Sequence, residues 1–290
     1  MQTAKLHLYV DDTVIYSVAS SLNQAMHDLQ LAFQQLQVSL NGLKLVLNTK
    51  KTKFMTFSRA RSQSPDNITI NTLNGDLIEN VSSYKYLGFW LDNKLSFKVH
   101  VEKLVKKLKL RLGFYFRNKT CFNMSARKTL VQATFLSVLD FGDVVYMHAA
   151  SSTLHLLDSV YHSALRFLTN SYSHTHHCTL YELVGWPSLS LRRQLDLYIF
   201  LYKAMLGKLP AYLCNLLKLN SSHFHLRSTR WRSYQVSMVF TELRKKSFSY
   251  FAPWSWNNLQ NLLHLNDLIP LNEFKAMLKC HVIEKCNCPM

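Results

Sequence analysis

The feature that most constrains the fold is a change in hydrophobic pattern near residue 97. Before it, short alternating runs typical of strands surround the segment 21–40, where Leu22, Met26 and Leu29 recur at the three- and four-residue spacing of one helical face. After residue 97, helical spacing continues to the end of the chain with short breaks. Only 7 Gly and 6 Pro are present, which argues against a many-turned all-β fold. We therefore expect an α+β fold that becomes mostly helical.

Local signals place several elements before this change. Ser21 and Gln24 predict a capping box at the start of the first helix, and Asn41-Gly42 predicts a left-handed stop at its end. The segment 43–57 is strand-like around a polar centre. The turn Asn74-Gly75 between apolar residues predicts a hairpin. The aromatic segment 84–92 reads as a strand, in which a glycine indicates close approach of another backbone.

Charge and cysteine content bear on partners and compartment. The net charge is +17, with 34 basic and 17 acidic residues, which favours a polyanionic partner, either nucleic acid or an anionic membrane surface. The 6 cysteines are sparse until the last residues, and no signal peptide is evident, so we expect reduced thiols in a cytoplasmic or nuclear protein that is not secreted. No apolar run is long enough for a membrane span, and we expect no membrane partner. The oligomeric state stays open.

Two adjacent carboxylates, Asp11 and Asp12, are predicted to occupy the turn between two apolar strand-like runs near the N-terminus. Aspartate is common in turns because its side chain bonds the local backbone, so a simple turn is one reading. The other reading is a hairpin that presents both carboxylates to Mg²⁺, an ion that takes oxygen ligands and often completes its shell with substrate phosphates.

The stretch Tyr9–Thr13 resembles the Tyr-x-Asp-Asp box of reverse transcriptases, in the form used by the LINE-type, non-LTR retrotransposons. The features that follow that box in this family also follow here in order: a helix, then Gly42, Asn48 and Lys51-Thr52, then Tyr84-x-Tyr86-Leu87-Gly88 with Leu91-Asp92 and Leu95-Ser96-Phe97, then His100 and a basic helix. Segments such as "LDFGDVVY" and "HHCTLYELVGWPSL" resemble the C-terminal part of these polyproteins. The resemblance covers essentially the whole chain.

The resemblance implies the C-terminal fragment of an RNA-directed DNA polymerase. It implies a truncated polymerase palm of antiparallel β-hairpins plus a helix over residues 1–97, a thumb-like basic helical region over 98–150 and a helical extension over 151–290. The family's reaction adds nucleotides to a primer 3′-hydroxyl with two Mg²⁺ ions. The implied partners are an RNA template and a DNA primer.

The same resemblance implies roles for single residues. Asp11 would ligate the metal directly, and Asp12 would assist. Lys51 would lie near the incoming triphosphate, where a lysine offers charge and a proton to the leaving pyrophosphate. The neighbouring Lys50 and Lys53 leave that assignment uncertain by a position, and a solvated loop is the alternative. Residues placed near the primer would be Tyr9, under the turn, and the primer-grip hairpin of Tyr86, Leu87 and Gly88.

The helix after residue 97 has one strongly basic face. Its cations are Lys103, Lys106, Lys107, Lys109 and Arg111. They would neutralise phosphates along a duplex and give salt-dependent binding without sequence preference. A solvated surface with no partner is the alternative reading.

A working palm in this family needs a third carboxylate from an upstream strand, and only eight residues precede Tyr9. We therefore expect this chain to be inactive by itself. A non-catalytic nucleic-acid-binding protein that uses the basic helix is the alternative function, and a remnant without a selected function is a third reading.

Two clusters of metal-ligand types occur in the helical part. His174-Thr175-His176-His177-Cys178 contains zinc ligands, but adjacent residues are expected to have difficulty reaching one tetrahedral centre. The tail residues Cys280, His281, Cys286 and Cys288 lack the spacing of a zinc knuckle. We assign no metal to either cluster, and we expect the aromatic residues Phe251, Trp254 and Trp256 to be core.

Overall fold

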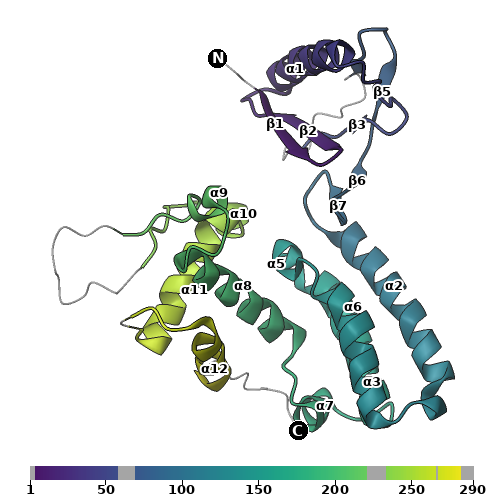
Figure 1. Cartoon of the computed structure of the whole chain (residues 1–290), viewed down its shortest axis with the longest axis vertical. Helices are drawn as coiled ribbons and strands as arrows, with labels where there is room; N and C mark the ends of the chain where they lie inside the picture. The colour runs from purple at the N-terminus through teal and green to yellow at the C-terminus, as the bar shows by residue number, and fades with distance from the viewer. Residues whose placement is uncertain (1–3, 58–68, 221–232, 266, 282–290) are drawn as a thin grey trace. The chain divides into compact units, whose positions relative to one another are not determined.

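The computed structural model describes residues 4–57, 69–220, 233–265 and 267–281, in two compact units, Met1–His100 and Val101–Met290. The first unit combines short strands with one long helix, and the second is helical (Figure 1). The expected α+β fold is therefore confirmed. None of the described helices is both long and apolar enough to cross a membrane. The polar loop 59–66 and the tail cysteines Cys286 and Cys288 lie outside the described residues.

The first unit contains three small sheets within its described residues. Its elements are β1 (Ala4–Tyr9), β2 (Asp12–Ser17), α1 (Leu22–Gly42), β3 (Lys53–Phe54), β4 (Ile70–Asn71), β5 (Leu77–Asn80), β6 (Ser83–Tyr86) and β7 (Phe89–Asp92). The pairs β1–β2, β4–β5 and β6–β7 are antiparallel, as expected, and the hairpin around Asn74-Gly75 is confirmed. One pair differs, because β3 runs parallel to β5. The strand expected over 43–57 shortens to β3 alone.

Helix α1 begins where its capping residue predicts. The Ser21 side chain accepts a hydrogen bond from the Gln24 backbone N–H at 3.3 Å. The Gln24 side chain bonds Asp28 at 2.8 Å instead of reaching back to Ser21, so only half of the capping box forms. The expected stop at Asn41-Gly42 is wrong: both residues are helical, and the left-handed residue is Lys44, with φ of 57°.

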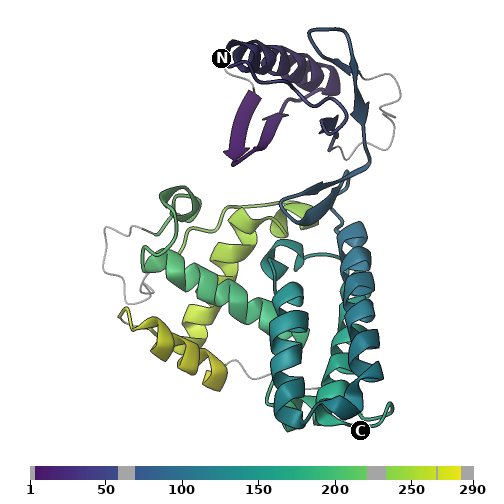
Figure 2. The same ribbon diagram turned by 45° about the vertical axis from the view of Figure 1, so that its right-hand side comes forward.

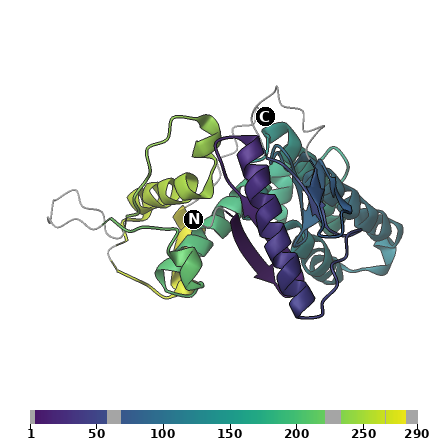
Figure 3. The ribbon, with the colours of Figure 1, turned by 90° about the horizontal axis from the view of Figure 1, so that it is seen from above.

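The core of the first unit lies between α1 and the small sheets. Phe33 of α1 is buried with Phe54, Ile70 and Ile78 from β3, β4 and β5, and Ile15 of β2 packs against this cluster. Figures 2 and 3 show α1 lying alongside the β1–β2 hairpin. Each such side chain contributes about 1.5–3 kcal/mol when fully buried, so this small core is what holds the hairpin to the helix.

Strand β1 has little cover within the described part of the unit. It pairs only with β2 there, and its apolar residues Leu6 and Leu8 are 50% and 67% exposed. An uncovered apolar strand edge favours pairing with further chain. Among the described residues, the edge of the aspartate hairpin is therefore exposed.

The second unit is built from helices joined by short turns. Its elements are α2 (Lys98–Arg117), whose first residues belong to the first unit, η1 (Lys119–Cys121), α3 (Met124–Leu130), the π-helical turn η2 (Val131–Leu136), α4 (Ser137–Leu139), α5 (Asp143–Tyr146), α6 (Ser151–Thr169), α7 (His177–Val184), α8 (Leu189–Met205), α9 (Ala211–Cys214), α10 (Glu242–Lys245), α11 (Phe248–Leu263) and α12 (Leu271–His281). No disulfide joins the described cysteines, Cys121, Cys178, Cys214 and Cys280.

Aromatic contacts attach the end of α2 to its neighbours. The ring of Tyr115 stacks on Phe167 of α6 with 5.1 Å between centroids, and its hydroxyl hydrogen-bonds Thr134 of η2. Thr134 lies in a π-helical turn, where widening of the helix changes which side chains face a neighbour. The basic helix therefore has one fixed apolar face.

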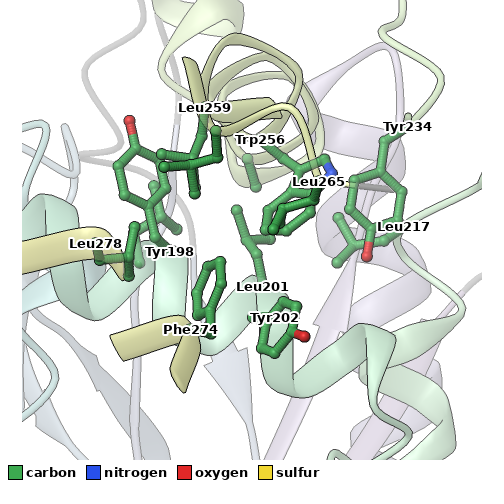
Figure 4. Close-up of a cluster of buried hydrophobic side chains, with 13 residues drawn as sticks. Tyr198, Leu201, Tyr202, Leu217, Tyr234, Trp256, Leu259, Leu265, Phe274 and Leu278 are labelled. Carbon is green, nitrogen blue, oxygen red and sulfur yellow. The ribbon is translucent and has the colours of Figure 1, made fainter. Parts of the chain in front are cut away.

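A second core fills the space between α8, α11 and α12 (Figure 4). The ring of Tyr202 stacks on Phe274 at 3.8 Å between centroids, and Trp256 lies beside them, fully buried. The expectation that the aromatic residues near Pro253 are core is confirmed for Trp256. It is wrong for Trp254, which is 46% exposed.

Candidate metal and nucleic-acid site

The β1–β2 hairpin presents the aspartate pair at an exposed tip. Tyr9 pairs with Asp12 at the end of the ladder, so Val10 and Asp11 form the two-residue turn and Asp12 begins β2. This corrects the expectation that both aspartates occupy the turn. Both are exposed, and Tyr9 is 59% exposed rather than covered by the turn. The carboxylates are thus held next to one another with their oxygens open to a ligand.

The turn at the tip carries backbone strain. Val10 has φ of 55°, a left-handed conformation that is an outlier for a β-branched residue. Hairpin turns of two residues need a positive φ at their first position, which normally selects Gly, Asn or Asp. Holding valine there costs about 1–3 kcal/mol. The side chain of Val10 is 90% exposed, so no burial offsets this cost.

The described residues supply two carboxylates at this tip and no more. Across the described part of the chain, Asp11 and Asp12 belong to no group of three or more metal-ligand side chains close enough to share an ion. Mg²⁺ accepts one or two carboxylates with waters and phosphates completing its shell. The donor set therefore fits Mg²⁺ as part of a site that a nucleotide would complete.

Lys51 is exposed on a loop with a fixed backbone. Its N–H donates to the Asn48 side-chain oxygen at 3.1 Å, and its carbonyl accepts a hydrogen bond from the Tyr84 hydroxyl at 3.4 Å. Lys53 is engaged in an ion pair with Glu79 at 2.5 Å, which leaves Lys50 and Lys51 as exposed candidates. Within the described residues, Lys51 forms no ion pair with either aspartate of the hairpin.

The second hairpin, β6–β7, ends in another strained turn. Tyr86 pairs with Phe89, so Leu87 and Gly88 form the turn, with φ of 46° and 90°. Positive φ at both positions is typical of a type I′ turn, and Gly88 meets that demand. Gly88 is therefore a turn residue and not, as expected, a glycine inside a strand. Leu87 is 37% exposed at the tip, and Tyr86 is half-buried.

A buried carboxylate connects this hairpin to the basic helix. Asp92 ends β7 and accepts hydrogen bonds from the backbone N–H groups of Lys94, Ser96 and Phe97 and from the Ser96 hydroxyl, at 2.9–3.1 Å. Nearby, the His100 ring accepts a hydrogen bond from the Trp90 N–H at 3.3 Å. Burial lowers the pKa of His100, which favours the neutral ring that this bond requires. Both residues hold the start of α2.

Within the second unit, helix α2 presents its basic face to solvent. Lys103, Lys106, Lys107 and Lys109 are exposed, and Arg111 is half-buried. The opposite face is apolar and buried through Val101, Leu104, Val105, Leu108 and Leu112. A surface depression of about 430 Å³ lies along the basic side, lined by Glu102, Val105, Lys106, Lys109 and Leu110. The four lysines lie on the exposed side of the helix, whereas Arg111 is half-buried and lines a separate depression with Tyr115 and Thr134.

The second unit contains an acidic cluster that the sequence does not predict. Arg192 of α8 forms an ion pair with Asp140, with a 3.2 Å bond from Nε to Oδ1. Asp143 is 5% exposed, and burial with the nearby charges of Asp196 and Asp140 raises its pKa to about 7. Burial likewise raises the pKa of Asp196, which hydrogen-bonds Asp143. The pair Asp140 and Asp143 lies about fifty residues from Arg192 and Asp196 in the sequence, so no local pattern links the two pairs.

Comparison with known proteins places these features in a family context. The chain is 25% identical over 166 residues to the RNA-directed DNA polymerase from mobile element jockey of Drosophila melanogaster, covering 56% of this chain and 18% of that protein. The protein of the same name in Drosophila funebris is 31% identical over 107 residues, covering 36% of this chain and 11% of that protein. The probable RNA-directed DNA polymerase from transposon BS of Drosophila melanogaster is 24% identical over 170 residues, 58% of this chain and 18% of that protein.

The chain thus spans less than a fifth of the length of the curated relatives it matches. No family model and no solved structure matches it. Over a little more than half of its length, the chain is a distant homologue of the reverse transcriptases of non-LTR retrotransposons.

Proposed function

We propose that this chain is a segment of an RNA-directed DNA polymerase that carries part of the catalytic palm and the thumb. The observation that carries the proposal is the β1–β2 hairpin, which holds two adjacent exposed carboxylates at its tip. The distant homology to mobile-element polymerases supports the same reading. In this proposal the palm part is 1–97, the thumb-like helical part is 98–150, and 151–290 is a helical extension.

The hairpin residues would act on the metal and the primer. Asp11 at the exposed turn would ligate Mg²⁺ directly, and Asp12 beside it would assist. When bound, Mg²⁺ ions activate the attacking 3′-hydroxyl and stabilise the leaving pyrophosphate of nucleotidyl transfer. Tyr9, next to the turn and exposed, is positioned to contact the primer end.

The loop and the second hairpin would hold the reacting strands. Lys51 is exposed and its backbone is fixed by Asn48 and Tyr84, so its ammonium group would be available to an incoming triphosphate. The tip of β6–β7, formed by Leu87 and Gly88 with Tyr86 beside it, would press against the primer backbone. The Tyr84–Lys51 hydrogen bond ties these two parts together.

We further propose that this chain does not catalyse nucleotide addition by itself. Its described residues bring two carboxylates to the hairpin tip, and two-metal transfer needs more oxygen ligands than these supply. The test is primer extension on poly(rA)·oligo(dT) with Mg²⁺, and the expected result is no product. Extension that Asp11→Ala abolishes would contradict the claim of inactivity and support catalysis by this hairpin.

Metal binding at the tip can be tested without turnover. Fe²⁺ replaces Mg²⁺ at oxygen sites, and with ascorbate and peroxide it cuts the nearest backbone. With a primer–template and a nucleotide triphosphate present, we expect cleavage near residues 9–13 that Asp11→Asn and Asp12→Asn remove. Asp76→Asn changes another exposed turn aspartate and is the matched control. Cleavage at the hairpin that persists in both hairpin variants would rule out the metal assignment.

Non-catalytic nucleic-acid binding is the second candidate function. It is favoured by the predominantly basic, exposed face of α2, whose lysines need no intact catalytic site to contact phosphates. Binding that survives loss of both aspartates would separate this function from catalysis.

A further inference from the structure

Three metal-ligand side chains converge at the start of α7, far in sequence from the aspartate hairpin. The possible ligand atoms of His176, His177 and Cys178 all lie within 4.8 Å of one another. His177 and Cys178 are half-buried, and His176 is exposed. Among the described residues, this is the group of histidine, cysteine and acidic side chains that could close around one ion.

The local backbone explains why adjacent residues converge here. His176 caps the helix in an extended conformation, with φ of −65° and ψ of 145°, whereas His177 and Cys178 are already helical. The change of direction at the cap lets consecutive side chains gather on one side. Adjacent residues are expected to have difficulty reaching one tetrahedral centre, but at this cap the change of direction brings their possible ligand atoms within 4.8 Å of one another.

The surrounding side chains hold this turn in place. Arg166 of α6 donates a hydrogen bond to the Thr175 carbonyl at 3.1 Å, which fixes the segment before the cap. The His162 ring of α6 stacks on His177 with 5.2 Å between centroids, and its Nε2 lies 2.7 Å from the Tyr181 hydroxyl. The half-buried cluster is therefore supported from a second helix.

We propose that His176, His177 and Cys178 form a binding site for Zn²⁺ or a similar borderline-soft divalent cation. One thiolate with two imidazoles is a zinc-type donor set, quite unlike the oxygen ligands that Mg²⁺ selects. Three protein ligands leave a fourth tetrahedral position, which water fills on the exposed side of His176. His162 and Tyr181 act as positioning residues that orient His177.

The expected rearrangement on binding is small. The ring of His176 accepts a hydrogen bond from the Cys178 N–H at 3.4 Å, which is long for a strong bond. When His176 ligates a metal, its ring no longer accepts this hydrogen bond, so the cap contact is replaced by a metal–ligand bond.

The role that this position supports is structural. A cation bound at the first turn of α7 would stabilise the connection from α6, because His177 packs against His162 of that helix. Any ion that binds the folded chain and not the unfolded chain raises its stability in proportion to RT ln(1 + [L]/Kd). Zn²⁺ should therefore raise the melting temperature of the wild-type chain.

Cobalt spectroscopy tests the site directly. The full chain is stripped with a chelator and titrated with Co²⁺, whose thiolate charge-transfer and ligand-field bands report sulfur ligation and tetrahedral geometry. The titration uses a background in which Cys280, Cys286 and Cys288 are serine, because these tail thiols could bind cobalt themselves. We expect one equivalent to bind and Zn²⁺ to displace it.

Matched variants locate the ligands. Cys178→Ser should abolish the charge-transfer band, and His176→Ala or His177→Ala should weaken binding by more than the roughly 10–100-fold that loss of an outer-shell partner costs. Cys121→Ser and His174→Ala change an exposed cysteine and a neighbouring histidine and should leave the band intact. Circular dichroism confirms that each variant folds. A band that survives Cys178→Ser, or no cobalt binding by the folded chain, would overturn the proposal.

Discussion

The carboxylate of Asp92 accepts a hydrogen bond from the backbone N–H of Phe97, with 2.9 Å between Oδ2 and N. This bond closes a loop in which Leu95 and Phe97 both have positive φ, at 50° and 56°. The backbone is strained at these two left-handed residues, and hydrogen bonds to the buried carboxylate offset that strain. The start of the basic helix therefore depends on a buried residue that lies outside its exposed basic face.

Removal of this carboxylate should loosen the junction between β7 and α2. Asp92→Ala loses four hydrogen bonds to a charged acceptor, and we expect the unfolding free energy of the first unit to fall by about 2–4 kcal/mol. Asn93→Ala changes the exposed neighbour and should cost less than about 0.5 kcal/mol. Urea unfolding followed by circular dichroism makes the comparison. Equal effects of the two variants would contradict the anchoring role.

The strain at Val10 gives a prediction of the opposite sign. Val10→Gly places the one residue that tolerates φ of 55° without cost, so it should stabilise the first unit by about 1 kcal/mol. The matched control is Val46→Gly. Val46 is similarly exposed, at 95%, but its φ is not positive, so this change should be neutral or destabilising. Thermal unfolding of both variants decides the matter, and a loss of stability in Val10→Gly would refute the strain.

Asp143 should make the stability of the second unit depend on pH. Its pKa is raised to about 7 in the folded chain by burial and by Asp196 and Asp140, against an ordinary value of 3.8 in the unfolded chain. The folded state therefore binds more protons between these values, and stability is lost as pH rises from about 4 to 7.

Asp143→Asn removes the charge that the fold disfavours. This variant should be more stable than wild type at pH 8, and its stability should change less between pH 5 and pH 8. Asp267→Asn neutralises an exposed carboxylate of the same unit and should leave the pH profile unchanged. Urea midpoints measured across this range provide the test. A wild-type profile that rises with pH through this window would contradict the assignment.

Much of the fold can be predicted from local chemistry. The cap at Ser21, the apolar face of α1 and the turn at Asn74-Gly75 depend on residues within a few positions of one another, and the structure confirms them. The end of α1 cannot be predicted from local sequence alone, because Gly42 can continue a helix as well as stop it. The left-handed residue is Lys44. Its backbone N–H donates to the Asn41 carbonyl, and the N–H of Leu45 donates to the Leu40 carbonyl.

The features that could not be predicted depend on contacts between distant segments. Asp140 and Arg192 pair across fifty-two positions, and the raised pKa of Asp143 follows from burial by α8. The convergence of His176 and Cys178 depends on the backbone turn at a helix cap, which composition alone does not reveal.

We propose that this chain is a polymerase segment that holds nucleic acid through α2. The most direct measurement is the affinity of the full chain for an RNA–DNA primer–template over a salt series, by fluorescence anisotropy. We compare wild type with a variant in which Lys103, Lys106, Lys107 and Lys109 are glutamine. A control replaces the exposed lysines Lys208, Lys218, Lys275 and Lys279 in the same way.

We expect wild-type affinity to fall steeply with salt and the α2 variant to lose roughly 3 from the slope of log affinity against log salt, about 0.7–0.9 for each phosphate contact. The control should keep the wild-type slope, although its net charge falls by the same amount. A slope that is flat in wild type, or that changes equally in both variants, would contradict the claim that α2 is the nucleic-acid-binding surface.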